Sequence, residues 1–159
     1  MKIAVGSDHG GFALKEAVKK HLEAKGIEVE DFGCYSTESV DYAVYGAKVA
    51  HCVADGKADY GVLVCSTGIG ISMAANKVKG IRAALCSDTH AAEMTRRHNN
   101  ANMLAMGAGI VGPNLAERMV DVFLSTEFDG GRHTKRVELM MEIEAEPSRK
   151  MFRKDKKGN

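Results

Sequence analysis

Residues 60–72 read Tyr-Gly-Val-Leu-Val-Cys-Ser-Thr-Gly-Ile-Gly-Ile-Ser. A hydrophobic run with the composition of a strand ends at Cys65, and a glycine-spaced turn at Gly68 and Gly70 opens the next helix. The turn brings a thiol and the Thr67 hydroxyl close to backbone N–H groups at the positive end of a helix, where an anion is stabilised. We therefore expect the chemistry of this protein to take place at this turn.

Short β-rich runs alternate with longer segments of helical periodicity on both sides of this stretch. Five runs qualify as strands: residues 2–6, 27–32, 60–65, 81–86 and 103–107. Such alternation is typical of βαβ units and a parallel sheet covered on both faces. The sequence thus predicts an α/β fold, a three-layer α/β/α Rossmann-like single domain with a five-stranded parallel sheet.

Apolar residues at three- and four-residue spacing predict the helices between and after these strands. The first follows residue 11 and presents Leu14, Val18 and Leu22; the second covers 42–53. A third begins at Gly112-Pro113, with proline near its first turn, and a last helix covers 132–144. We expect the domain to span 1–146 and the basic, aperiodic residues 147–159 to form a frayed tail.

Composition limits the classes of function. The chain has 159 residues, 45% of them hydrophobic, which suits one domain with a substantial core. A formal net charge of +1 gives no electrostatic reason to expect a nucleic-acid or membrane-surface partner. The first residues resemble neither a signal peptide nor a membrane span, so we expect a cytoplasmic protein whose four separated cysteines stay reduced.

Spacing tests the interpretations of the turn after residue 65. A Walker loop needs Gly-Lys-Ser/Thr, and a dinucleotide fingerprint needs a third glycine; residues 68–73 supply neither. A cysteine phosphatase loop needs arginine where this chain has Ile71. Two alternatives remain for Cys65: a buried strand cysteine, or a base beside a helix N-terminus that abstracts a proton.

Other polar residues join this turn if the sheet is parallel, because ligands bind beyond the carboxyl ends of its strands. Asp8 and His9 follow the first strand and read either as a helix cap with a solvated imidazole or as part of the site. His98 suits proton exchange near neutral pH, although basic residues there also suit a helix terminus. Arg132 and Arg136 share a helical face, which is either solvated or a phosphate clamp.

The six histidines form no HExxH or other compact ligand set in the sequence, so we expect no metal. We also expect no cofactor.

Seven ordered motifs resemble the type B ribose-5-phosphate isomerases and their relatives, the galactose-6-phosphate and allose-6-phosphate isomerases. The motifs are Ser7-Asp8-His9-Gly10, residues 38–42, residues 65–72, Ala74-Ala75-Asn76-Lys77, Gly80-Ile81-Arg82-Ala83, residues 98–102 and residues 128–133. Together they cover nearly the whole chain, from Lys2 to about Glu144.

The resemblance implies a metal-free interconversion of a phosphorylated aldose and ketose through an enediolate. Cys65 then resembles the base and Thr67 the hydroxyl that exchanges protons with the substrate oxygens, while the N–H groups of residues 66–70 stabilise the enediolate. His98, with Asp8, resembles the group that opens the sugar ring. The implied substrate-binding residues are His9, Ser66, Gly68, Ile69, Gly70, Asn99, Arg132 and Arg136.

The resemblance also implies a homodimer, or a higher oligomer, in which His98 and Asn99 reach the site of the partner subunit. We expect ribose 5-phosphate and ribulose 5-phosphate as the reactants. The alternatives are a six-carbon sugar phosphate and, in a different class, a non-catalytic sugar-phosphate-binding protein.

Three positions depart from the pattern of the family. Gly109 stands where many relatives have a phosphate-contacting arginine, Ala43 replaces a proline, and Ser66 replaces a glycine. None of them removes a proton-transfer group. The missing arginine, however, is expected to weaken phosphate binding or to mark a different sugar phosphate.

Overall fold

Five parallel strands form the centre of the computed structural model, which describes residues 1–145. The strands are β1 (Lys2–Ser7), β2 (Glu28–Asp31), β3 (Tyr60–Cys65), β4 (Ala83–Leu85) and β5 (Met103–Gly107). They lie in the order β2-β1-β3-β5-β4, and every neighbouring pair is parallel. The predicted α/β class and five-stranded parallel sheet are confirmed. The predicted domain limit at 146 and the tail over 147–159 lie outside the described residues.

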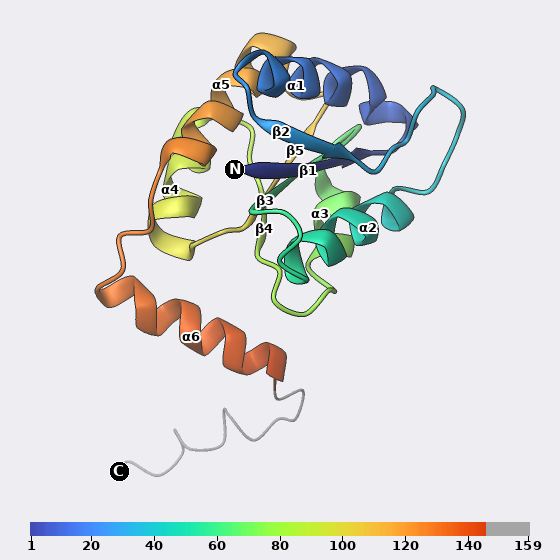
Figure 1. Ribbon diagram of the computed structural model, residues 1–159. Helices are drawn as coiled ribbons and strands as arrows, with labels where there is room; N and C mark the ends of the chain where they lie inside the picture. The colour runs from blue at the N-terminus through green and yellow to red at the C-terminus, as the bar shows by residue number, and fades with distance from the viewer. Residues whose placement is uncertain (146–159) are drawn as a thin grey trace, which may run out of the picture.

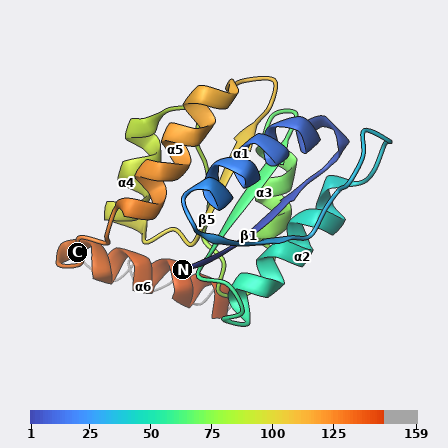
Figure 2. The same cartoon turned by 45° about the horizontal axis from the view of Figure 1, so that its top comes forward.

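Helices cover both faces of the sheet. They are α1 (Phe12–Ala24), α2 (Tyr42–Ala54), α3 (Ile69–Ala75), α4 (Thr89–Asn99), α5 (Pro113–Ser125) and α6 (Arg132–Ala145), and a single 3-10 turn, η1 (His9–Gly11), precedes α1. Helices α1, α4 and α5 lie on one face, and α2 and α3 lie on the other (Figures 1 and 2). Among residues 1–145 we find no helix with the length and apolar character needed to cross a membrane.

Alternation along the strands divides the core between these two layers. In β3, Val62 and Val64 pack with α1 and α5, whereas Leu63 and Cys65 pack with α2 and α3. Successive strand residues point to opposite faces, so a strand buried on both sides is apolar at every position. The residues of β5 are all buried in the same way.

Three strands differ from their predicted lengths: β1 extends one residue further, to Ser7, β2 covers only Glu28–Asp31 of the predicted 27–32, and β4 differs most. Residues 81–86 are predicted as a strand, but β4 covers only Ala83–Leu85. The Ile81 amide instead donates to Val78 in a turn, and the Arg82 amide donates to the Asn102 side chain at 2.8 Å. Their hydrogen bonds are made outside the sheet ladder, which explains the later start of the strand.

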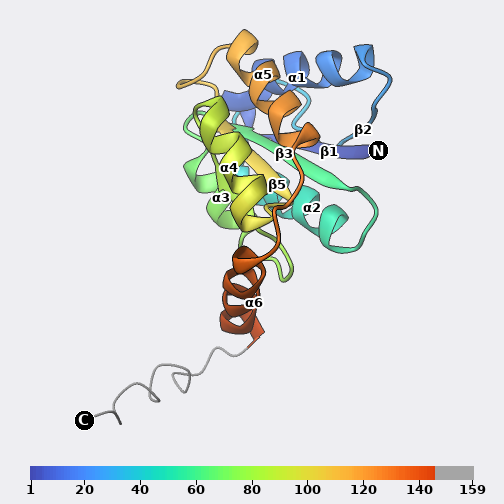
Figure 3. The same ribbon diagram turned by 90° about the vertical axis from the view of Figure 1, so that its left-hand side faces the viewer.

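Helix α6 projects beyond the α/β/α layers (Figures 1 and 3). His133 is its only buried residue among those described, and Leu139, Met140 and Ile143 are exposed. Its far end is tied to the domain by the Glu144 carboxylate, which accepts hydrogen bonds from the Gly80 amide at 3.1 and 3.0 Å. The helix therefore presents apolar surface that residues 1–145 leave uncovered.

Candidate functional site

Cys65 is the last residue of β3 and is only 4% exposed. Its Sγ accepts a hydrogen bond from the Gly68 N–H at 3.0 Å. Gly68 adopts a left-handed conformation, with φ of 77°, and a Cβ there would collide with the Met106 backbone. Glycine is therefore needed at this position to aim an amide at the sulfur. The turn thus holds the sulfur at the carboxyl end of the strand, beside the N-terminus of α3.

The rest of the turn, residues 66–70, leads into α3. Ser66, Thr67 and Ile69 are exposed, and the Thr67 Oγ1 accepts from the Ile69 N–H at 3.3 Å. Two of the amides predicted to stabilise an enediolate, those of Gly68 and Ile69, thus already donate within the turn. A substrate oxyanion gains these two donors only by displacing the thiol or the hydroxyl.

Asp8 and His9 adjoin this turn because β1 and β3 are neighbours. The Asp8 Oδ1 accepts from the Gly11 N–H at 3.0 Å and caps η1, so the capping role is confirmed for one carboxylate oxygen. His9 Nδ1 accepts from the Val40 N–H at 3.1 Å. Because Nδ1 is an acceptor, the neutral His9 ring carries its proton on Nε2 and has one N–H to donate to a ligand.

A buried ion pair that was not predicted supports the segment that carries Val40. Lys15 is 1% exposed, and its Nζ donates to both Asp31 carboxylate oxygens and to the Cys34 carbonyl, each at 2.8 Å. Burial alone raises the pKa of Asp31, but hydrogen bonds from Lys15, Gly33 and Lys19 outweigh it and hold the pKa below its usual range. The one available signal was a lysine beside Leu14 on the apolar face of α1.

The remaining predicted residues form a second group, at the amino ends of the strands. His98 and Asn99 close α4, just before β5 begins at Met103. Arg132 and Arg136 lie in the first turns of α6, where both side chains are exposed. The Arg136 Nη1 lies 3.5 Å from Nδ1 of His133, a residue that was not predicted.

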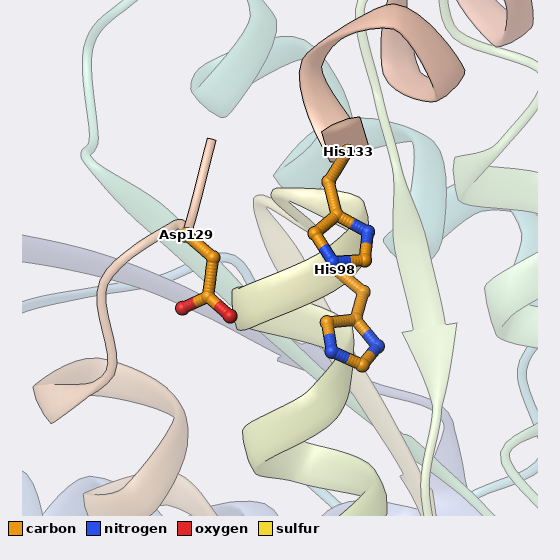
Figure 4. Close-up of side chains that lie close together, drawn as sticks. All are labelled: His98, Asp129 and His133. Atoms are coloured by element: carbon orange, nitrogen blue, oxygen red, sulfur yellow. The ribbon is translucent and has the colours of Figure 1, made fainter. Parts of the chain in front are cut away.

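His98 and His133 lie face to face, with ring centroids 4.3 Å apart and planes 10° from parallel (Figure 4). Asp129 lies beside them, and within residues 1–145 these three side chains have possible ligand atoms all within 4.8 Å. No compact ligand set is present along the sequence, as expected, but these three possible ligands lie close together in the fold because α6 packs against α4. A metal bound by both rings would have to lie in both ring planes, and stacked planes do not meet. Arg97 also holds Asp129, with Nε at 3.1 Å from each oxygen. We therefore describe a histidine stack braced by an ion pair.

The two groups lie at opposite ends of the sheet. Cys65 pairs with Gly107 at the carboxyl end of β5, whereas Gly61 pairs with Met103 at its amino end, next to α4's last turn. Four rises of about 3.3 Å separate these pairs, or about 13 Å along the strands. A single chain therefore brings Cys65, Thr67, Asp8 and His9 together, and keeps His98, Asn99, Arg132 and Arg136 apart from them.

An apolar groove lies between α6 and the domain, close to the second group. It measures about 510 Å³, and its lining includes Arg82, Asn99, Met140 and Ile143. Exposed apolar side chains also surround the Cys65 turn: Tyr42, Val44, Ile69 and Met73. Both groups of predicted site residues thus border apolar surface.

Two motifs at the carboxyl ends of β1 and β3, residues 7–10 and 65–72, on a five-stranded parallel sheet define a class of small-molecule site rather than a fold alone. Residues 3–140 match the family model described as Ribose/Galactose Isomerase. The chain belongs to this family of sugar isomerases. The resemblance seen in the sequence is therefore confirmed.

Relatives and solved structures agree with that assignment. The chain is 49% identical over 143 residues to ribose-5-phosphate isomerase B of Escherichia coli, covering 90% of this chain and 96% of the relative. It matches the structure of Clostridium thermocellum ribose-5-phosphate isomerase B with a TM-score of 0.92 and 52% identity, over 93% of this chain and 100% of that one. The Mycoplasma genitalium enzyme, solved with bound ribulose-5-phosphate, matches with a TM-score of 0.87 and 39% identity, over 91% and 97%.

Proposed function

We propose that this protein is an aldose–ketose isomerase that interconverts ribose 5-phosphate and ribulose 5-phosphate. The observation that carries the proposal is the Cys65 thiol, which accepts the Gly68 N–H at 3.0 Å at the carboxyl end of a central strand. Family membership over residues 3–140 supports the reaction class, and the relatives named ribose-5-phosphate isomerase B support the substrate.

The chemistry follows from one base and a stabilised oxyanion. The Cys65 thiolate removes the proton from C2 of the open-chain aldose, and the electron pair forms the C1–C2 double bond of an enediolate. Thr67 exchanges a proton between the two substrate oxygens, and the thiol returns its proton to C1. Amides of residues 66–70 stabilise the enediolate, those of Gly68 and Ile69 after they leave the thiol and the hydroxyl, and one such donor contributes about 3–4 kcal/mol. The reaction needs no metal and no cofactor.

The other residues bind the sugar and open its ring. His98, with Asp8, moves a proton between the ring oxygen and the anomeric hydroxyl, which opens the ring. His9, Arg132 and Arg136 bind the phosphate, and Asn99 binds sugar hydroxyls. Guanidinium groups suit a phosphate because they donate two parallel hydrogen bonds.

We further propose a homodimer with shared active sites, because one chain holds the two groups at opposite ends of its sheet. In a two-fold dimer each chain gives its carboxyl-end group to one site and its amino-end group to the other. The exposed side chains of Ile69 and Met73 near Cys65, and of Met140 and Ile143 near Asn99, supply apolar surface for this contact. A higher oligomer can be built from such dimers.

The identity of the sugar is supported by the names of the relatives rather than by the geometry of the site. A six-carbon substrate, allose 6-phosphate or galactose 6-phosphate, is the alternative, and Gly109 in place of an arginine is the observation in its favour. A relative from Pectobacterium atrosepticum, 41% identical over 139 residues, is named D-erythrulose-4-phosphate isomerase. A non-catalytic binding protein is disfavoured because a binder needs no base, hydroxyl and ring-opening acid together.

The free thiols of all four cysteines support a cytoplasmic protein.

A coupled assay with ribose 5-phosphate, allose 6-phosphate and galactose 6-phosphate tests this proposal. We expect turnover of ribose 5-phosphate and a loss of about 10³-fold or more in Cys65→Ala. Cys86→Ala is the matched control, because it removes another buried thiol next to a strand end. Binding of a sugar phosphate without turnover would overturn the enzyme proposal. Full activity in Cys65→Ala would mean that another residue is the base.

A further inference from the structure

The histidine stack consists of His98, in the last turn of α4, and His133, in the first turn of α6 (Figure 4). His133 is 8% exposed although the rest of α6 projects from the domain. The His133 side chain thus anchors the start of α6 in the domain. Its ring stacks on His98, the residue to which we assign ring opening.

Charged groups surround His133 on every packed side. Arg132 and Arg136 come from its own helix, His98 and Arg97 from α4, and Asp129 from the preceding loop. Arg136 has only donors, so at 3.5 Å from Nδ1 it requires that nitrogen to be the acceptor. The remaining proton is then on Nε2, and the ring is neutral.

Electrostatics favour the same state. Burial lowers the pKa of His133, and His98, Arg132 and Arg136 lower it further, while Asp129 opposes them. The opposing effect of Asp129 on the pKa of His133 is limited, because both carboxylate oxygens of Asp129 bind Arg97. Two positively charged imidazoles stacked face to face would repel each other.

We propose that His133 is a positioning residue for His98: its neutral ring, held through Nδ1 against Arg136, fixes the orientation of the His98 ring stacked on it. The catalytic meaning of this pair rests on the proposed function of His98 in ring opening. The stacking and the neutral state of His133 do not.

Titration of the histidine ring C–H resonances by NMR in the full chain tests the pair directly, without substrate. We expect the His133 midpoint to lie below the ordinary value of about 6.5. His98→Phe keeps an aromatic face and removes the competing charge, so the His133 midpoint should rise by at least about half a unit. His90→Phe, which changes an exposed histidine at the start of α4, is the matched control and should leave the His133 midpoint unchanged.

A His133 midpoint at or above the ordinary value in the parent, or one that His98→Phe leaves unchanged, would overturn the proposal. Activity gives a second readout. His133→Ala should lower kcat, His133→Phe should recover most of the loss, and the acid limb of the pH profile should persist in the Phe variant. A Phe variant as impaired as the Ala variant would contradict a positioning role. An inactive parent would refute the proposed function and leave the titration result valid.

Discussion

Cys65 and His98 lie at opposite ends of one sheet in the same chain. Cys65 ends β3 at its carboxyl edge, and His98 closes the helix that leads into the amino end of β5. The proposed reaction needs a base and a ring-opening acid at one substrate, and a separation of about 13 Å along the strands exceeds what a side chain spans. The proposed dimer resolves the conflict, because a two-fold axis brings unlike ends together.

Gly68→Ala should impair both stability and catalysis. The new Cβ meets the Met106 backbone and forces a left-handed φ on an L-residue, which costs about 1–3 kcal/mol. It also displaces the N–H that donates to Cys65, so kcat should fall at least about tenfold. Gly56→Ala is the control: φ there is also positive, at 70°, but nothing lies within 4 Å of the added carbon. Urea unfolding and steady-state kinetics measure both effects, and equal behaviour of the two variants would contradict this role.

Lys15→Met should destabilise the protein strongly. It leaves Asp31 as a buried charge without its main partner, a loss of about 3–5 kcal/mol in comparable pairs. Lys19 binds the same carboxylate at 3.2 Å but is 30% exposed, so Lys19→Met should cost under about 1 kcal/mol. Denaturant unfolding compares the two. A similar small loss in both would mean that the ion pair does not support the 31–41 segment.

The pH dependence of stability should follow Asp31. Its pKa is lower in the folded state, so the folded state releases this proton more readily than the unfolded chain. The contribution is present above the unfolded value, about 3.9, and is lost as the pH falls through the folded pKa. The stability difference between the parent and Asp31→Asn should therefore be constant from pH 5 to 7 and shrink below about pH 4. A difference that grows on acidification would contradict the assignment.

Gly109→Arg should strengthen phosphate binding. Gly109 is exposed and adjoins the Cys65 turn through its N–H bond to the Ser66 carbonyl at 2.9 Å. It stands at the position for which the resemblance implies an arginine in many relatives. An added guanidinium there should lower KM for ribose 5-phosphate several-fold, with kcat little changed. Gly112→Arg adds the same charge to the same loop where space is open, and serves as control. An unchanged KM in Gly109→Arg would mean that the phosphate lies elsewhere.

The sequence predicted the fold closely because burial on both faces leaves a strong pattern. β3 and β5 have the predicted bounds, since every residue of these central strands is apolar or glycine. β4 was predicted too long, because Ile81 is buried in a turn, and burial alone does not distinguish a turn from a strand.

The candidate site was predictable only in part. Cys65, Thr67, Asp8 and His9 follow strand ends, and parallel topology alone brings them together. The stacking of His133 on His98 and the pairing of Lys15 with Asp31 join residues far apart in the chain, and no local periodicity marks them. The separation of Cys65 and His98, by contrast, follows from the position of His98 just before the fifth strand, at the amino end of the sheet.

Subunit complementation tests the shared site most directly. Cys65→Ala and His98→Ala dimers should each be inactive, and mixing them with subunit exchange gives heterodimers with one intact site and one doubly altered site. Random exchange makes half of the dimers heterodimers, so about a quarter of the parent activity should return. No recovery, with heterodimers confirmed by native mass spectrometry, would contradict a site built from two chains.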